Sequence, residues 1–206
     1  MDVSFKNRTE AGKELATRLT AYSGRLDVIV LALPRGGVPV AFEVARALDV
    51  PLDVFIVRKL GVPGNEELAM GAIATGGVRV LDKEIVRQLS QDVVNSVARR
   101  ETEELARRDR LYRGQRPKPN VADRTVILVD DGLATGATML AAVLALRRMR
   151  PAKLIIAVPV AAPEVCAEFR NEVDEIICAV TPDLFVSWDN GMRSFRRLGT
   201  KRYVTC

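Results

Sequence analysis

The chain has 206 residues, of which 48% are hydrophobic and 28% are charged, as expected for one globular domain with a single core. Its formal net charge of +5 suits an anionic ligand but does not by itself indicate one. The three cysteines form no CxxC pair, so they indicate neither a disulfide framework nor a zinc site; they are Cys166, Cys178 and Cys206. The chain contains no histidine, which excludes Ser-His and Cys-His catalysis. With a polar start and no long apolar run, we expect a cytoplasmic protein without a membrane span.

Short apolar runs rich in β-branched residues predict the strands. Their apolarity is continuous, which is typical of parallel strands that helices cover on both faces. The runs, in chain order, are residues 28–33, 52–57, 126–129, 154–158 and, more weakly, 175–180. The helical patterns that alternate with them are residues 38–48, 138–149 and 163–169. This alternation predicts an α/β fold with a doubly wound, mostly parallel five-stranded sheet, whose ligand lies at the carboxyl ends of the strands.

The middle of the chain departs from this alternation. Residues 70–74 and 78–81 flank Thr-Gly-Gly and predict a hairpin. Residues 82–112 carry one apolar stripe and a face of mixed charges, which predicts a single long helix. We interpret about 82–113 as a helical insertion into one domain that spans residues 1–206, with its core at about 28–180.

The segment VILVDDGLATGATM places two acids at the end of a predicted strand. Asp130 and Asp131 come first, and residues 134–138 then lead into a helix whose first N–H groups have no intrahelical partner. Glycine, hydroxyl groups and the helix dipole together suit a phosphate. Asp130 and Asp131 directly precede this turn in the sequence, so we expect them to lie at the distance of a sugar attached to the phosphate.

Two further segments carry positive charge to the same edge. In LALPRGGVPVAF, the residues Arg35, Gly36 and Gly37 open directly into a helix and suit a second anion. In VRKLGVPGNEELAMG, the pair Arg58 and Lys59 follows the second predicted strand. Two anion sites at one sheet edge fit a diphosphate ester.

These three segments resemble the motifs of type I phosphoribosyltransferases, and the pattern is closest to adenine phosphoribosyltransferase. The resemblance covers about residues 28–158. It implies that Asp130 and Asp131 face the ribose hydroxyls of phosphoribosyl pyrophosphate (PRPP). It also implies that the peptide from Pro34 to Arg35 is cis. The residues implied to hold the 5'-phosphate are Ala134, Thr135, Gly136, Ala137 and Thr138. Those implied to hold the pyrophosphate are Arg35, Gly36, Gly37, Arg58 and Lys59.

The resemblance further implies a reaction, a cofactor and partners. A base nitrogen attacks the anomeric carbon of PRPP as pyrophosphate leaves, with Mg²⁺ held mainly by PRPP and by no direct protein ligand. A hood built from about residues 1–22 and 181–206 is expected to bind the base, with Trp188 as a candidate stacking residue. Ala134 stands where enzymes for 6-oxopurines carry an acid, which argues against a hypoxanthine-guanine enzyme. A homodimer is expected.

Two other functions remain open at this point. The chain could be a non-catalytic regulator that senses PRPP or a nucleotide and binds nucleic acid through Arg147, Arg148 and Arg150. Those arginines follow the end of a predicted helix, where the dipole favours cations in any case, so nucleic acid is not the partner we expect first. A hydrolase or phosphatase that uses the same anion sites is a weaker third hypothesis.

Overall fold

The computed structural model describes residues 5–134 and 136–181, apart from the side chain of Glu67. Its helices are α1 (Arg8–Thr17), the 3₁₀ turn η1 (Thr20–Tyr22), α2 (Gly37–Leu48), α3 (Lys83–Val86), α4 (Gln91–Arg113), α5 (Ala137–Arg148) and α6 (Pro163–Phe169). Its strands are β1 (Val28–Ala32), β2 (Leu52–Val54), β3 (Val57–Val62), β4 (Asn65–Ala74), β5 (Val78–Leu81), β6 (Thr125–Val129), β7 (Lys153–Val160) and β8 (Glu175–Val180).

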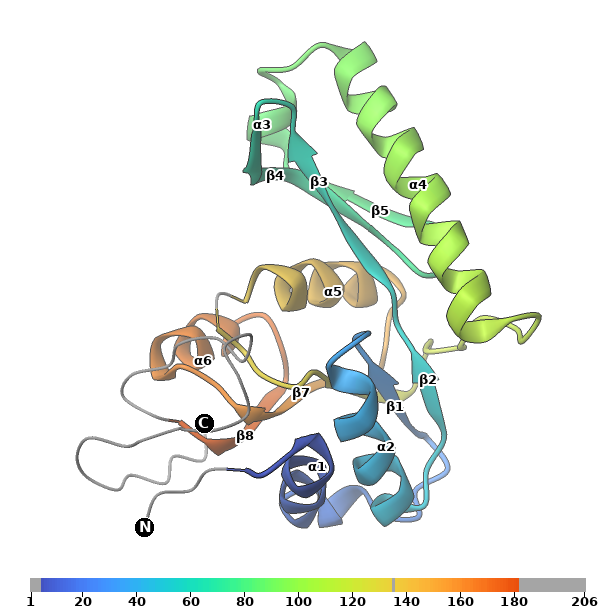
Figure 1. Ribbon diagram of the computed structural model, residues 1–206, viewed down its shortest axis with the longest axis vertical. Helices are drawn as coiled ribbons and strands as arrows, with labels where there is room; N and C mark the ends of the chain where they lie inside the picture. Colours follow the sequence, from blue (N-terminus) through green and yellow to red (C-terminus); the bar gives the residue numbers. More distant parts are fainter. Residues whose placement is uncertain (1–4, 135, 182–206) are drawn as a thin grey trace.

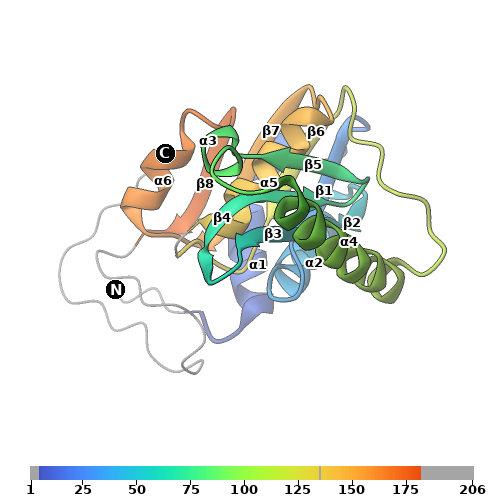
Figure 2. The ribbon, with the colours of Figure 1, turned by 90° about the horizontal axis from the view of Figure 1, so that it is seen from above.

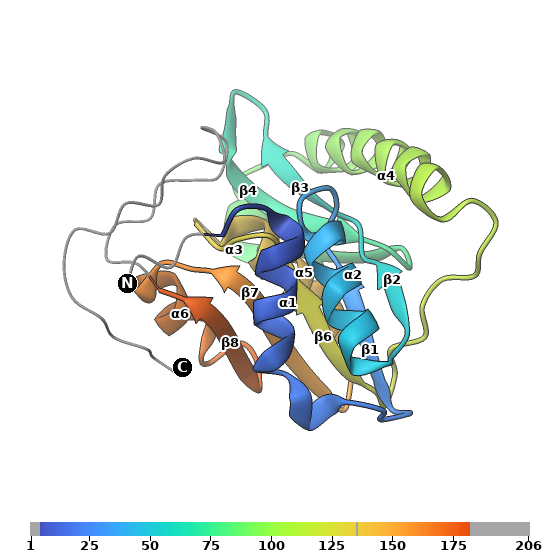
Figure 3. The ribbon, with the colours of Figure 1, turned by 60° about the horizontal axis from the view of Figure 1, so that its bottom comes forward.

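The main sheet confirms the predicted fold class. It has five strands in the order β2-β1-β6-β7-β8, and every pairing between them is parallel. Helices α1 and α2 cover one face, as Figure 3 shows, and α5 and α6 cover the other. All five residues of β1 and of β6 are buried, which explains why these strands are continuously apolar in the sequence.

The predicted strand at residues 52–57 is shorter than expected. Strand β2 ends at Val54, and the chain leaves the main sheet after the N–H of Phe55 bonds to the carbonyl of Ala32 at 2.9 Å. Beyond it, the buried hydroxyl of Thr75 accepts from the N–H of Ile56 at 2.9 Å. The backbone of this apolar run is therefore bonded to two different sheets.

A second, antiparallel sheet has the order β3-β4-β5. Its β4–β5 hairpin confirms the hairpin predicted around Thr75-Gly76-Gly77, whereas β3 and the first half of β4 were not predicted. The β3–β4 pairing is irregular between Leu60 and Gly61 and again between Gly61 and Val62. Seen from above, α4 lies across this sheet (Figure 2), and the two share a third apolar cluster that includes Leu60, Met70 and Leu105.

The single helix predicted for residues 82–112 is wrong, because the chain forms two helices there. The side chain of Asp82 accepts from the N–H of Glu84 and caps α3, and the hydroxyl of Ser90 accepts from the N–H of Val93 and caps α4. A new cap at Ser90 begins a new helix within the apolar stripe. Within the described ranges, no helix combines the length and apolar character that a membrane span requires.

The carboxyl end of α4 is anchored to the edge of the main sheet (Figure 1). The side chain of Arg113 is 1% exposed and donates to Asp53 Oδ2 and to the carbonyl of Val54, both at 2.8 Å. It also donates to the carbonyl of Pro117 at 3.1 Å. One buried guanidinium thus joins β2, the helix and the loop that follows it.

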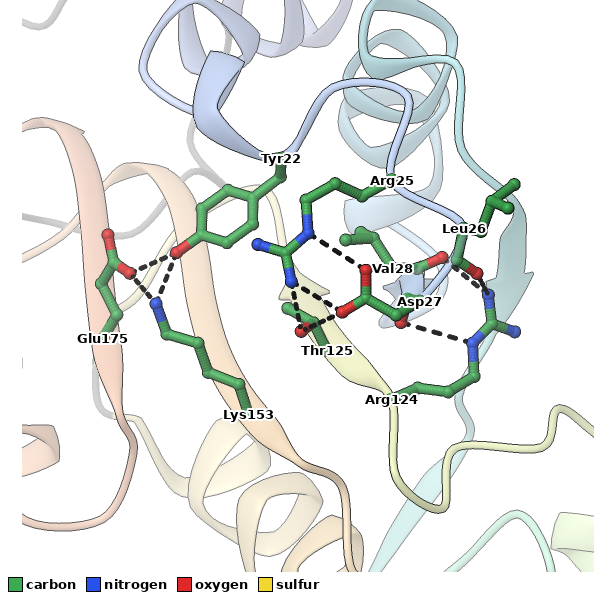
Figure 4. A network of polar contacts seen from close by, with 9 residues as sticks. All are labelled: Tyr22, Arg25, Leu26, Asp27, Val28, Arg124, Thr125, Lys153 and Glu175. Atoms are coloured by element: carbon green, nitrogen blue, oxygen red, sulfur yellow. Dashed lines mark hydrogen bonds and ion pairs between the residues drawn. The ribbon is translucent and has the colours of Figure 1, made fainter.

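The amino ends of the strands carry a separate polar network, drawn in Figure 4. Lys153 at the start of β7 donates to Glu175 and to the hydroxyl of Tyr22, each at 2.7 Å. Arg124 donates to the carbonyl oxygen of Val28 at 2.8 Å. The hydrogen bonds of these polar groups are thus made within the protein at the amino ends of the strands. The carboxyl ends of the same strands lie at the opposite end of the sheet.

Replacing Arg113 tests its role as an anchor. We expect Arg113→Ala to lower the free energy of unfolding by about 3 kcal/mol, because Asp53 and two carbonyl groups lose a buried donor. Arg110→Ala removes an exposed arginine of the same helix and should cost less than about 0.5 kcal/mol. Urea unfolding of both variants gives the comparison, and equal effects would contradict the anchoring role.

Candidate active site

Two loops meet at the carboxyl edge of the main sheet because their strands are neighbours. β1 and β6 pair in register from Val28 with Thr125 to Ala32 with Val129. The N–H of Leu33, just beyond β1, donates to the carbonyl of Val129 at 2.9 Å. The structure therefore brings the loop before α2 and the loop before α5 side by side, as the sequence predicted.

The glycines of the first loop allow this contact. A Cβ atom on Gly36 would lie 2.1 Å from Asp131 Oδ2, and one on Gly37 would lie 2.7 Å from the carbonyl oxygen of Val129. Gly37 has no room for a side chain because the neighbouring atoms belong to the backbone, whereas at Gly36 the carboxylate of Asp131 would have to shift. The Pro34–Arg35 peptide is cis, as the resemblance implied, and Arg35 is exposed.

Asp131 is held by a residue that lies in none of the three sequence motifs. Arg8, the first residue of α1, contacts Asp131 Oδ2 through Nε at 2.8 Å and through Nη2 at 2.6 Å. Arg8 was not predicted as a site residue, since it lies 123 positions from Asp131 in the sequence. The one available signal was weak: a cation in the first turn of a helix opposes the helix dipole and therefore suggests a compensating partner.

Asp130, the first acid of the pair, is half-buried and has a shifted pKa. Burial raises the pKa of Asp130 to about 8, and the negative charge of Asp131 acts in the same direction. Its Oδ1 accepts from the backbone N–H of Asp131 at 2.8 Å. The raised pKa favours the protonated form of Asp130, whose carboxyl group can donate a hydrogen bond to a hydroxyl group as well as accept one.

The predicted phosphate turn lies at the start of α5. Leu133 is tied to the end of β7, since its N–H donates to the carbonyl of Val160 at 2.9 Å. Gly136 has φ of +70° and caps the helix, and a Cβ there would lie 2.8 Å from the ring of Phe169. Ala134 is half-buried, and Ala137 and Thr138 form the first turn of α5. Thr135 lies outside the described residues.

Arg58 and Lys59 do not form one basic patch. Both lie within β3, where successive side chains point to opposite faces. Arg58 points to α4, where its guanidinium meets the buried carboxylate of Glu101 at 2.6 Å. Lys59 shares the other face with Val57, which packs against the core cluster that contains α5. Of this pair, only Lys59 lies on the side of the main sheet.

The base hood is described only in part. Trp188 and residues 182–206 lie outside the described residues, as do residues 1–4. The described part of the N-terminal segment packs on the main sheet through Ala11, Leu15 and Ala16. Within this segment, the first turn of α1 reaches the site through Arg8.

The arginines considered for nucleic acid are partly engaged within the chain. Arg147 donates to Asp174 Oδ2 at 3.0 Å and to the carbonyl of Glu172 at 3.1 Å. This ion pair ties the end of α5 to the loop before β8. It gives Arg147 a structural role that needs no nucleic acid.

Comparison with known proteins agrees with this geometry. A family model described as the phosphoribosyl transferase domain matches residues 5–191. The chain belongs to this family. A Mycobacterium tuberculosis protein, named provisionally as a phosphoribosyl transferase, is 46% identical over 202 residues in strains CDC 1551 / Oshkosh and H37Rv. These matches cover 97% of this chain and 45% of the relatives' length, so the chain spans about half of each.

A solved structure resembles the whole fold. The crystal structure of TT1426 from Thermus thermophilus superposes with a TM-score of 0.80 at 42% sequence identity. The match covers 90% of this chain and 88% of the Thermus chain. The main sheet and its helices thus agree with a phosphoribosyl transferase domain, as the sequence predicted.

The raised pKa of Asp130 predicts a pH-dependent stability. Between about pH 4 and about pH 8 the folded chain keeps a proton on Asp130 that the unfolded chain has released, so stability falls as pH rises through this window. Asp130→Asn keeps the oxygen acceptor and removes the titration. We expect the variant to gain stability relative to wild type by more than about 1 kcal/mol across the window. Urea unfolding of both proteins at a series of pH values measures this difference. If the free energy of unfolding changed with pH equally in the wild type and the variant, the raised pKa of Asp130 would be contradicted.

Proposed function

We propose that the chain transfers the 5-phosphoribosyl group of PRPP to a nitrogen heterocycle and releases pyrophosphate. One observation carries the proposal: Asp131 lies against Gly36, so the acid pair and the Pro34–Gly37 loop form one continuous surface. The start of α5, at Gly136, follows the acids by five residues. This order of anion loop, acids and helix amino end suits a sugar with a phosphate group at each end.

The proposed mechanism relies on positioning and charge. The helix amino end and Thr138 would hold the 5'-phosphate, while the Pro34–Gly37 loop and Lys59 would hold the pyrophosphate. Asp130 and Asp131 would hydrogen bond to the ribose hydroxyls, and the carboxylate of Asp131 would favour positive charge as it develops on the sugar. No protein nucleophile is needed, because the base nitrogen attacks the anomeric carbon directly.

Magnesium is part of this proposal. Mg²⁺ prefers oxygen ligands and commonly binds through substrate phosphates, and the carboxylates here place negative charge beside the proposed sugar. When bound to PRPP, Mg²⁺ would neutralise the pyrophosphate as it leaves. Asp130 and Asp131 would keep the ribose hydroxyls oriented next to it.

The acceptor is proposed as a class. The half-buried Ala134 offers no carboxylate to a base, which disfavours a 6-oxopurine acceptor and leaves other nitrogen heterocycles. We also propose that the protein acts in the cytoplasm as a homodimer, as the family resemblance implies. Equilibrium sedimentation tests the dimer.

Calorimetry with PRPP and Mg²⁺ tests the site. We expect Asp130→Asn/Asp131→Asn to weaken PRPP binding by at least about tenfold, because the ribose hydroxyls lose their charged acceptor. A screen for pyrophosphate release over a set of bases then identifies the acceptor. Binding without release from any base would favour a regulator, and phosphate release without an acceptor would favour a hydrolase.

The opposite faces of β3 allow a matched pair of variants. Lys59→Gln should weaken PRPP binding about fivefold with unchanged stability, because it removes a partly screened charge from the site. Arg58→Gln should instead lower the free energy of unfolding by about 2 kcal/mol, because the buried Glu101 loses its main partner. Calorimetry and urea unfolding on both variants distinguish these outcomes, and identical behaviour would contradict the assignment of faces.

A further inference from the structure

Arg8 contacts the acid pair from outside the family motifs. It is the first residue of α1, and Asn7 caps that helix by accepting from the N–H of Glu10 at 2.9 Å. Both Nε and Nη2 of Arg8 reach the same oxygen of Asp131, at 2.8 and 2.6 Å. The side chains of Arg8 and Asp131 are 32% and 19% exposed, so the contact lies at the wall of the site and is partly shielded from water.

Backbone packing fixes Arg8 in this place. Gly12 lies one turn further along α1 on the same face, where a Cβ would be 2.7 Å from the carbonyl oxygen of Val40. The missing side chain lets α1 pack closely against α2, which begins at Gly37 directly after the cis peptide. The position of Arg8 is therefore tied to the loop that we propose holds pyrophosphate.

The contact leaves one oxygen of Asp131 for another partner. Arg8 donates twice to Oδ2, and the same carboxylate lies where Gly36 has no side chain. The two contacts from Arg8 restrain the rotation of the carboxylate. Its Oδ1 receives no hydrogen bond from Arg8, so it can accept from a sugar hydroxyl without breaking the ion pair.

We propose that Arg8 is a positioning residue of the PRPP site, which fixes the carboxylate of Asp131 so that its Oδ1 meets a ribose hydroxyl. This inference rests on the proposed function and extends it to the N-terminal helix. The guanidinium also offsets part of the negative charge that two adjacent carboxylates would otherwise present to a polyanionic substrate. Arg8 acts through Asp131 and does not itself react.

The test compares three single variants in calorimetry with PRPP and Mg²⁺. We expect Arg8→Gln to raise the Kd about tenfold, because the carboxylate of Asp131 loses its fixed orientation. Arg8→Lys should recover part of this loss, since an ammonium group supplies the charge without the two-pronged geometry. Lys13→Gln removes the same charge from an exposed position of α1 and should bind PRPP as wild type does.

A double-variant cycle separates positioning from direct contact. If Arg8 acts through Asp131, then Arg8→Gln/Asp131→Asn should bind PRPP no more weakly than Asp131→Asn alone. Additive losses would overturn the inference, because they would mean that Arg8 meets PRPP directly. If Arg8→Gln fails to fold by circular dichroism, Arg8→Lys is measured in its place, with and without Asp131→Asn.

Two results distinguish this inference from the function on which it rests. If wild type binds PRPP and Arg8→Gln binds it equally or more tightly, Arg8 either plays no part or competes with the sugar, and the inference is wrong. If wild type does not bind PRPP, the proposed function itself is wrong. Where the bases screened give turnover, the loss in Arg8→Gln should appear in KM for PRPP more than in kcat.

Discussion

Five successive residue pairs join β1 to β6, and this pairing ends both strands at the same level of the sheet. The positions of the two loops that form the site follow from this pairing. The loop after β1 and the loop after β6 come so close that a Cβ atom at Gly37 would meet the backbone of Val129 and Asp130, and one at Gly36 would meet the carboxylate of Asp131. The acid pair therefore lies against the loop that carries the cis peptide, through backbone contacts as well as through side chains.

Placing two carboxylates side by side at a partly buried edge is costly, and the structure offsets this cost in two ways. Asp130 holds its proton more strongly than an exposed aspartate, and Asp131 has the guanidinium of Arg8. The amino-terminal helix therefore contributes to the charge balance of a motif that lies in the second half of the chain. Its first turn belongs to the site, while the rest of the helix covers the sheet.

The sequence predicted the features that depend on local pattern. The continuous apolar runs identified all five strands of the main sheet, and the glycine turns and acids located the site at their carboxyl ends. Features set by contacts between distant segments were missed. Strand β3 contains two adjacent charged residues, Arg58 and Lys59, and has no clear strand pattern, so the sequence placed this pair only after the second predicted strand. The side on which each of the two residues points depends on α4. Arg8 was missed for the same reason, because its partner is distant in the sequence.

The irregular pairing of β3 has a consequence for solubility. β3 is an edge of the second sheet, and an edge strand exposes backbone groups that can pair with another molecule. Two register shifts around Gly61 interrupt the regular row of donors and acceptors, and Lys59 adds a charge to the same strand. Together they make β3 a poor template for intermolecular strand addition, which protects the protein against aggregation through this edge.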